Sequence, residues 1–147
     1  KKLFAVLLAL VMMLAVGTTA LAADHTYVAY QIFSGVYDEG TGGLKNIAWG
    51  DGVSTTRTEN SAEVSIYTDL VAIGMKKSDN SAFTSVDEVV EALSAITTDD
   101  ADLTKDFAAV VAKYVQATNA KTATSGTISG LADGYYLVED SANPECL

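Results

Sequence analysis

The pattern of apolar and polar positions divides the chain into an apolar leader, two strand-like segments, a helical middle and a strand-like end. Residues 26–34, TYVAYQIFS, carry β-branched and aromatic side chains on both faces, which predicts a central strand. Residues 44–49 predict a second, shorter strand. The Gly-rich stretch at 38–43 predicts the turn that joins them.

The next segment supports two interpretations. The polar residues 54–58 predict an exposed stretch. Asn60 and Glu63 then match a capping box ahead of apolar residues at helical spacing, which favours a helix. Residues 64–66 also alternate as a strand would, so both interpretations stay open.

Two clearer helices follow. Ser85 and Glu88 have capping-box spacing, and the apolar residues behind them fall on one helical face. Residues 103–114 repeat apolar side chains at helical spacing and predict a third helix.

Near the end the period returns to two. Residues 127–129 and 135–139 predict short strands, with a turn at 130–134. Strands, then helices, then strands indicate a mainly β fold, an Ig-like β-sandwich with an inserted helical segment and α+β character. The predicted core consists of Tyr30, Ile32, Phe33, Trp49, Phe107, Val111, Tyr114, Tyr136 and Val138.

The first 23 residues have the organisation of a secretory signal peptide. Lys1 and Lys2 precede an apolar run, and small residues follow, so cleavage is predicted after Ala22 or Ala23. The run is shorter than the ~20 apolar residues that a membrane span needs, although an uncleaved anchor is the alternative. We therefore expect residues 24–147 to act as one domain outside the cytoplasm.

The charge of the chain excludes nucleic acid as a partner. Nine basic residues face 19 acidic ones, for a net charge of −10, and removal of the two leading lysines makes it about −12. Such a surface repels phosphate backbones, which bind through Lys and Arg. Cys146 is the only cysteine, so the chain forms no internal disulfide.

No catalytic, metal or cofactor site is predicted. His25 is the only histidine and lies beside the predicted cut, where a residue is usually mobile rather than held in a cleft. Asp99, Asp100 and Asp102 suit the positive end of a helix dipole. Calcium is the alternative for these aspartates together with Asp106, but the EF-hand spacing is absent.

Three segments together carry a resemblance to a known family. They are residues 27–35, residues 44–53, and residues 128–131 with 134–138. In this order they resemble the N-terminal domain of Gram-positive sortase-assembled pilin subunits, the isopeptide-forming fimbrial proteins. The acidic helical region between them is similar to that family as well.

The resemblance implies a structural subunit of a cell-wall-anchored pilus that supports adhesion. Its implied partners are other pilin subunits, joined covalently by a sortase, then peptidoglycan, and a host surface ligand. Domains of this family often carry Lys–Asn or Lys–Asp isopeptide bonds promoted by a buried acid. An apolar site favours that reaction because it lowers the pKa of the lysine and raises that of the acid.

The end of the chain resembles the E-box of this family in part. The matching residues are Tyr135, Leu137, Glu139, Ala142 and Pro144, whereas Asp140 stands where the family usually has Thr. The resemblance implies that Glu139 either assists amide formation or orients the linking lysine. The opening strand contains no lysine, and no pilin motif or sorting signal is present. We interpret residues 24–147 as an N-terminal pilin-type domain that is truncated at its C-terminal end.

Two other classes of function are consistent with the sequence. A ligand-binding adhesin domain, for carbohydrate or host matrix, predicts an exposed aromatic cluster, for which the exposure of Trp49 is the test. A secreted hydrolase fragment predicts a cleft with converging carboxylates of perturbed pKa.

Overall fold

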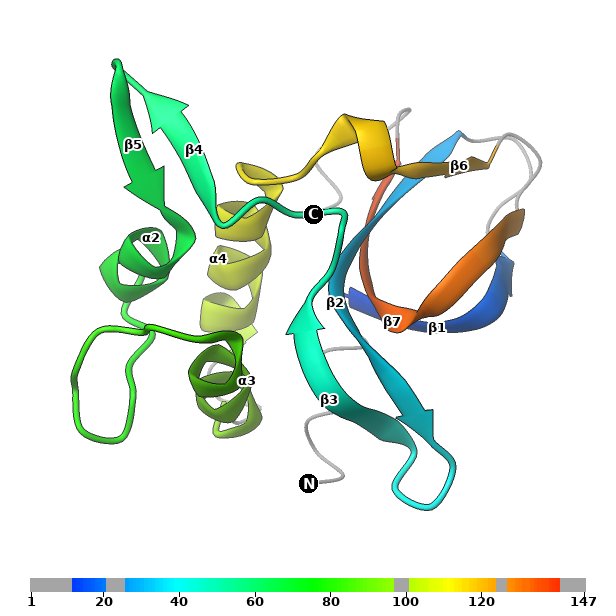
Figure 1. The fold of residues 1–147 in the computed structure, drawn as a ribbon, viewed down its shortest axis with the longest axis horizontal. Coiled ribbons are helices and arrows are strands. Elements are labelled where there is room, and N and C mark those ends of the chain that lie inside the picture. Colours follow the sequence, from blue (N-terminus) through cyan, green and yellow to red (C-terminus); the bar gives the residue numbers. More distant parts are fainter. Residues whose placement is uncertain (1–11, 21–25, 97–100, 124–126, 141–147) are drawn as a thin grey trace.

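A computed structural model describes residues 12–20, 26–96, 101–123 and 127–140 (Figure 1). Five strands form one antiparallel sheet: β1 (Met12–Ala20), β2 (Tyr27–Asp38), β3 (Gly43–Trp49), β6 (Lys121–Ala123) and β7 (Thr127–Asp140). The hairpin β4 (Thr56–Glu59) and β5 (Ala62–Ser65), the helices α2 (Ile66–Ala72), α3 (Val86–Ser94) and α4 (Ala101–Ala112), and the short turn η2 (Ala117–Asn119) are inserted between β3 and β6. The expected mainly β fold with α+β character is confirmed.

The central strand of the sheet is β2. It pairs with β7 along one edge, and with β3 and β6 along the other, so the order is β1-β7-β2-β3 with β6 beside β2. The register shifts between Gln31 and Phe33. Because of this irregularity, the consecutive residues Ile32 and Phe33 both belong to the main core. The predicted central strand is confirmed and extends four residues further.

After β3 the chain crosses closely over β2. The backbone N–H of Gly50 donates to the carbonyl of Ile32 at 2.8 Å, and that of Gly52 donates to the carbonyl of Gln31 at 3.1 Å. A side chain at either glycine would collide with the backbone of Gln31. Glycine is therefore required for this crossing.

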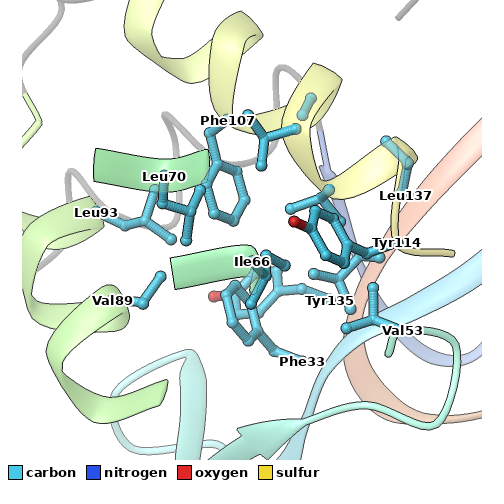
Figure 2. Packing of buried hydrophobic residues seen from close by; sticks show 14 of the residues in the cluster. Phe33, Val53, Ile66, Leu70, Val89, Leu93, Phe107, Tyr114, Tyr135 and Leu137 are labelled. Carbon is cyan, nitrogen blue, oxygen red and sulfur yellow. The ribbon is translucent and has the colours of Figure 1, made fainter. Parts of the chain in front are cut away.

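The helices pack on one face of the sheet (Figure 1). Figure 2 shows Phe107 of α4 pointing toward Leu70, Leu93 and Phe33. The Phe33 and Phe107 rings stack with centroids 6.2 Å apart. This arrangement makes the main core a sheet-to-helix interface.

The segment before α2 corrects two predictions. Asn60 and Ser61 adopt positive φ values of 50° and 67° in the tight turn between β4 and β5, so Asn60 caps no helix. The helix begins at Ile66, with Ser65 as its N-cap. The strand interpretation is right as far as Ser65. The expected exposed stretch at 54–58 is instead largely half-buried, because part of it forms β4.

The other two predicted helices are present. α3 begins with the predicted capping box, in which the Ser85 hydroxyl accepts from the backbone N–H of Glu88 and the Glu88 carboxylate accepts from that of Ser85. α4 ends at Ala112, so buried Tyr114 lies just beyond it.

The predicted turn at residues 130–134 is wrong. β7 continues through these residues as one strand, and Gly130 adopts a φ of +69°. The register against β1 shifts on both sides of Gly17, which lies opposite Leu131. A glycine at positive φ lets a strand kink without ending.

The other face of the sheet carries a smaller apolar cluster. Its buried members are Ala29, Ala123, Ile128, Leu131 and Tyr136. Most of the predicted core residues are buried, divided between this cluster and the main core, but Trp49 and Val138 are half-buried. The sheet therefore has an apolar patch on each face.

Part of the predicted leader is a strand of the sheet. β1 pairs antiparallel with β7, with Met12 opposite Leu137 and Ala20 opposite Thr127. Ala22 and Ala23 lie outside the described residues, so cleavage there stays a prediction. No helix among the described residues is long and apolar enough to cross a membrane.

Candidate functional site

The E-box-like acid Glu139 lies near the end of β7, directly opposite Val28 of β2. Tyr30, two residues along β2 from Val28, is therefore a diagonal neighbour on the same face. The Tyr30 hydroxyl donates a hydrogen bond to the Glu139 carboxylate. The partner of Glu139 across the strands is thus a phenol.

Tyr30 is only 8% exposed. Burial first, and then the negative charge and hydrogen bond of Glu139, raise the pKa of Tyr30 above its ordinary value. The phenol stays protonated at neutral pH and acts as a hydrogen-bond donor. The pair is a stabilising contact between β2 and β7.

The remaining E-box-like residues divide into two groups. Tyr135 and Leu137 are buried in the main core. Asp140 is half-buried and lies opposite Tyr27. Ala142 and Pro144 lie outside the described residues. Of the motif, the structure therefore brings the two apolar members into the core and Glu139 against Tyr30.

The described residues place no lysine amine beside Glu139. Lys45, Lys76, Lys105, Lys113 and Lys121 are exposed. Lys77 is half-buried, but its amine lies 2.6 Å from Glu88, and that hydrogen bond raises the pKa of Lys77 and keeps it charged. An isopeptide bond needs a neutral amine as the nucleophile. Within the described chain, Glu139 therefore has no donor for that reaction.

A second polar cluster, which the sequence did not predict, ties the β4–β5 hairpin to the helices. The Arg57 guanidinium lies 2.7 Å from Glu59 and 3.0 Å from Asp69 of α2. The Tyr114 hydroxyl donates to Asp69 at 2.9 Å, and the guanidinium lies 5.4 Å from the centroid of the Tyr114 ring. These contacts join residues up to 57 positions apart, so sequence spacing gives no sign of them.

The electrostatics of this cluster are those of an ion pair. Burial acts to raise the pKa of Asp69, but hydrogen bonds from Arg57 and Tyr114 outweigh it and hold that pKa below its ordinary value. A charged Asp69 accepts from both neighbours. The cluster is a structural clamp.

The other shifted carboxyl groups of the described residues are also shifted down. Hydrogen bonds from Lys77 and then from Thr84 lower the pKa of Glu88 to about 2. The pKa values of Asp38 and Asp79 are lowered by their hydrogen bonds to Lys45 and Ser81 respectively. A general acid needs the opposite shift, toward the working pH.

The described residues contain no group of three His, Cys, Asp or Glu side chains that could hold a metal ion. Asp102 is exposed at the start of α4, whereas Asp99 and Asp100 lie outside the described residues. His25 lies outside them as well.

Trp49 does not form an exposed aromatic platform. Its ring stacks on Phe33 with centroids 5.1 Å apart, and it packs against the main core. The indole N–H donates to the Tyr67 hydroxyl at 3.0 Å. Both the face and the polar edge of the ring are therefore engaged within the protein.

Comparison of the chain with protein-family models, curated proteins and solved structures finds no match. The function is therefore argued from the sequence and from the geometry above.

Proposed function

We propose that this chain is the N-terminal domain of a structural subunit of a sortase-assembled, wall-anchored pilus on a Gram-positive bacterium. The observation that carries the proposal is the position of Glu139. This acid lies late in the last described strand, beside the first strand after the leader, as the E-box resemblance implies. The residue beside this acid is Tyr30, which donates a hydrogen bond to it.

The arrangement of layers supports a load-bearing domain. The strands β2 and β7 pair over most of β2, and the helices cover one face. The opposite face carries the apolar cluster around Ile128 and Tyr136. We propose that the complete domain is an Ig-like sandwich, in which strands outside the described residues add to this sheet.

In this proposal the partners are other pilin subunits, the assembling sortase and peptidoglycan, with a host surface ligand at the assembled fibre. The domain acts without a cofactor and is not an enzyme. Its exposed lysines, such as Lys45, Lys105 and Lys113, are accessible amines for the assembling sortase.

Two observations favour this proposal over the alternatives. A carbohydrate-binding adhesin would present free aromatic faces, whereas Trp49 is stacked on Phe33. A hydrolase would hold an acid of raised pKa, whereas the shifts at Asp69 and Glu88 are downward.

The test is electrophoresis of wall extracts from the native host, probed with an antibody against this domain. The proposal predicts a ladder of high-mass species that survives boiling in detergent and disappears when the pilus sortase is deleted. A single band at the mass of one subunit, unchanged by the deletion, contradicts it.

A further inference from the structure

The leader strand β1 occupies the outer edge of β7. The partners on β7 run from Thr127, opposite Ala20, to Leu137, opposite Met12. We call residues 127–137 of β7, on the side that faces β1, the acceptor edge. The other side of β7 pairs with β2, so these two strands satisfy both edges of β7.

Cleavage of the leader after Ala22 or Ala23 would separate β1 covalently from the domain. If β1 then departs, the acceptor edge loses its partner. An unpaired edge presents a row of N–H and C=O groups that can template another strand. The acceptor edge includes the apolar residues Ile128, Leu131 and Tyr136, which are at most 7% exposed.

Natural edge strands are usually protected by lysine, proline or short length. β7 is 14 residues long and contains no lysine, arginine or proline. Its acids Glu139 and Asp140 lie beyond the region that pairs with β1.

The one acid within the acceptor edge is engaged on the opposite side. The Asp133 carboxylate accepts from the backbone N–H of Tyr37 at 3.0 Å. Its backbone carbonyl accepts from the Gln31 side-chain amide at 3.1 Å. Both partners belong to β2, so the charge of Asp133 does not prevent another strand from pairing along the acceptor edge.

The far edge of the sheet, at β3, is protected in the usual way. β3 has seven residues, with exposed Lys45 and with Asn46 at a φ of 52°. The helix α3 also contacts this strand. The contrast indicates that the acceptor edge of β7 is suited to pairing with another strand, whereas β3 is suited to be the last strand of the sheet.

We propose that the acceptor edge is a strand-binding site, which β1 fills in the precursor and an extended segment of another polypeptide fills after cleavage. The chemistry of that segment is given by β1, MMLAVGTTA: about nine residues, apolar or small, without charge, and antiparallel to β7. The proposal rests on the predicted cleavage and not on sortase chemistry.

The first test exchanges the strand in the complete chain. A specific protease site is inserted between Ala20 and Thr26, the purified chain is nicked, and a labelled peptide of residues 12–20 with a solubilising tail is added. The proposal predicts that the peptide displaces the nicked segment at one peptide per chain. A peptide with both Leu14→Pro and Ala15→Pro is expected to bind at least about tenfold more weakly, because one of two consecutive N–H groups in a strand points toward the partner and proline removes it.

A scrambled peptide of the same composition controls for simple hydrophobic adhesion. Equal binding of the parent, scrambled and proline peptides overturns the proposal, as does a folded, nicked monomer that binds none of them. Dimerisation of the nicked chain without uptake of peptide also overturns it, because the acceptor edge then pairs with the edge of a second folded copy and not with an extended segment. If the nicked chain unfolds when its segment is removed, recovery with the parent peptide alone supports the proposal, and failure to recover overturns it.

The second test fixes the register in the uncut chain with Cys146→Ser as background. Ala20→Cys with Thr127→Cys places the two cysteines directly opposite each other. Ala20→Cys with Ser129→Cys places them two residues out of register, where diagonal neighbours are ~7–8 Å apart and do not bridge. A disulfide in the first pair only is expected, whereas equal yields in both pairs overturn the proposal. Neither test uses a sortase or host cells, so their failure would leave the pilus proposal standing.

Discussion

At the scale of single residues, the informative contact is the hydrogen bond between Tyr30 and Glu139. An acid in this position can promote amide formation only if an amine faces it, and here a phenol does. The contact therefore holds β2 and β7 together without a covalent bond. It explains how the E-box resemblance and the lysine-free opening strand occur in the same domain.

Tyr30→Phe removes the donor from this pair. We expect a loss of about 1 kcal/mol in the free energy of unfolding, the usual net contribution of one hydrogen bond. Urea denaturation at pH 7 measures it. Tyr37→Phe, a change of the same size in the same strand, is the matched control. A Tyr30→Phe protein as stable as the parent would show that the pair contributes nothing.

A substitution at Gly52 tests how closely the chain crosses β2. Gly52→Ala forces a methyl group against the backbone of Gln31, and we expect a loss of about 1–3 kcal/mol, as for other overpacked sites. In Gly43→Ala the added methyl group meets nothing within 4 Å, so this control should change stability little. Thermal melting compares the two variants. Equal melting temperatures would show that the backbone at Gly52 does not lie so close to Gln31 that a side chain is excluded.

At the scale of elements, α3 is the most self-contained. Its N-terminus is held by the reciprocal capping box of Ser85 and Glu88, and Glu88 also accepts from Lys77 at 2.6 Å. One carboxylate therefore joins the helix start to the preceding loop. This element could be predicted because every interaction of the cap is local in sequence.

The cap predicts a specific dependence of stability on pH. The pKa of Glu88 falls from an ordinary 4.5 to about 2 on folding, so its contribution is present in full above about pH 4.5 and is lost as the pH falls toward 2. Glu88→Gln should flatten the stability curve in that window and lower stability at pH 7.

Urea midpoints at pH 7, 4 and 2.5 measure this effect. Glu91→Gln, a change of an exposed acid on the same helix, is the control and should keep the slope of the parent. A Glu88→Gln protein with the same slope as the parent would disprove the role of the cap.

The elements that sequence alone predicted poorly depend on distant contacts. Residues 60–66 contain signals for a helix and for a strand, and pairing of Val64 with Arg57 decides for the strand. β7 contains a turn-like GLADG, but its neighbours β1 and β2 keep it extended. The clamp of Arg57, Asp69 and Tyr114 lies beyond any local pattern. In each case tertiary pairing overrides local preference.

At the scale of the whole molecule, stability depends on the interface between the helices and the sheet. Phe107 is fully buried there and stacks with Phe33. Phe107→Ala should cost about 3–5 kcal/mol, the usual range for a buried aromatic residue. Val36→Ala, at a site 58% exposed, is the control and should be nearly neutral. Denaturant titration measures the free energy of unfolding of both variants. A small effect of Phe107→Ala would show that the interface between the helices and the sheet is not the main source of stability.

Membership of a covalent surface polymer is tested most directly by peptide mapping, with mass spectrometry, of the full-length protein released from host cell walls. We expect a branched peptide in which a lysine amine of one subunit is joined to the sorting signal of the next, and we expect it to be lost when the sortase is deleted. Complete coverage of the lysine-containing peptides as linear, unmodified species would contradict covalent assembly. The domain would then be a secreted binding module.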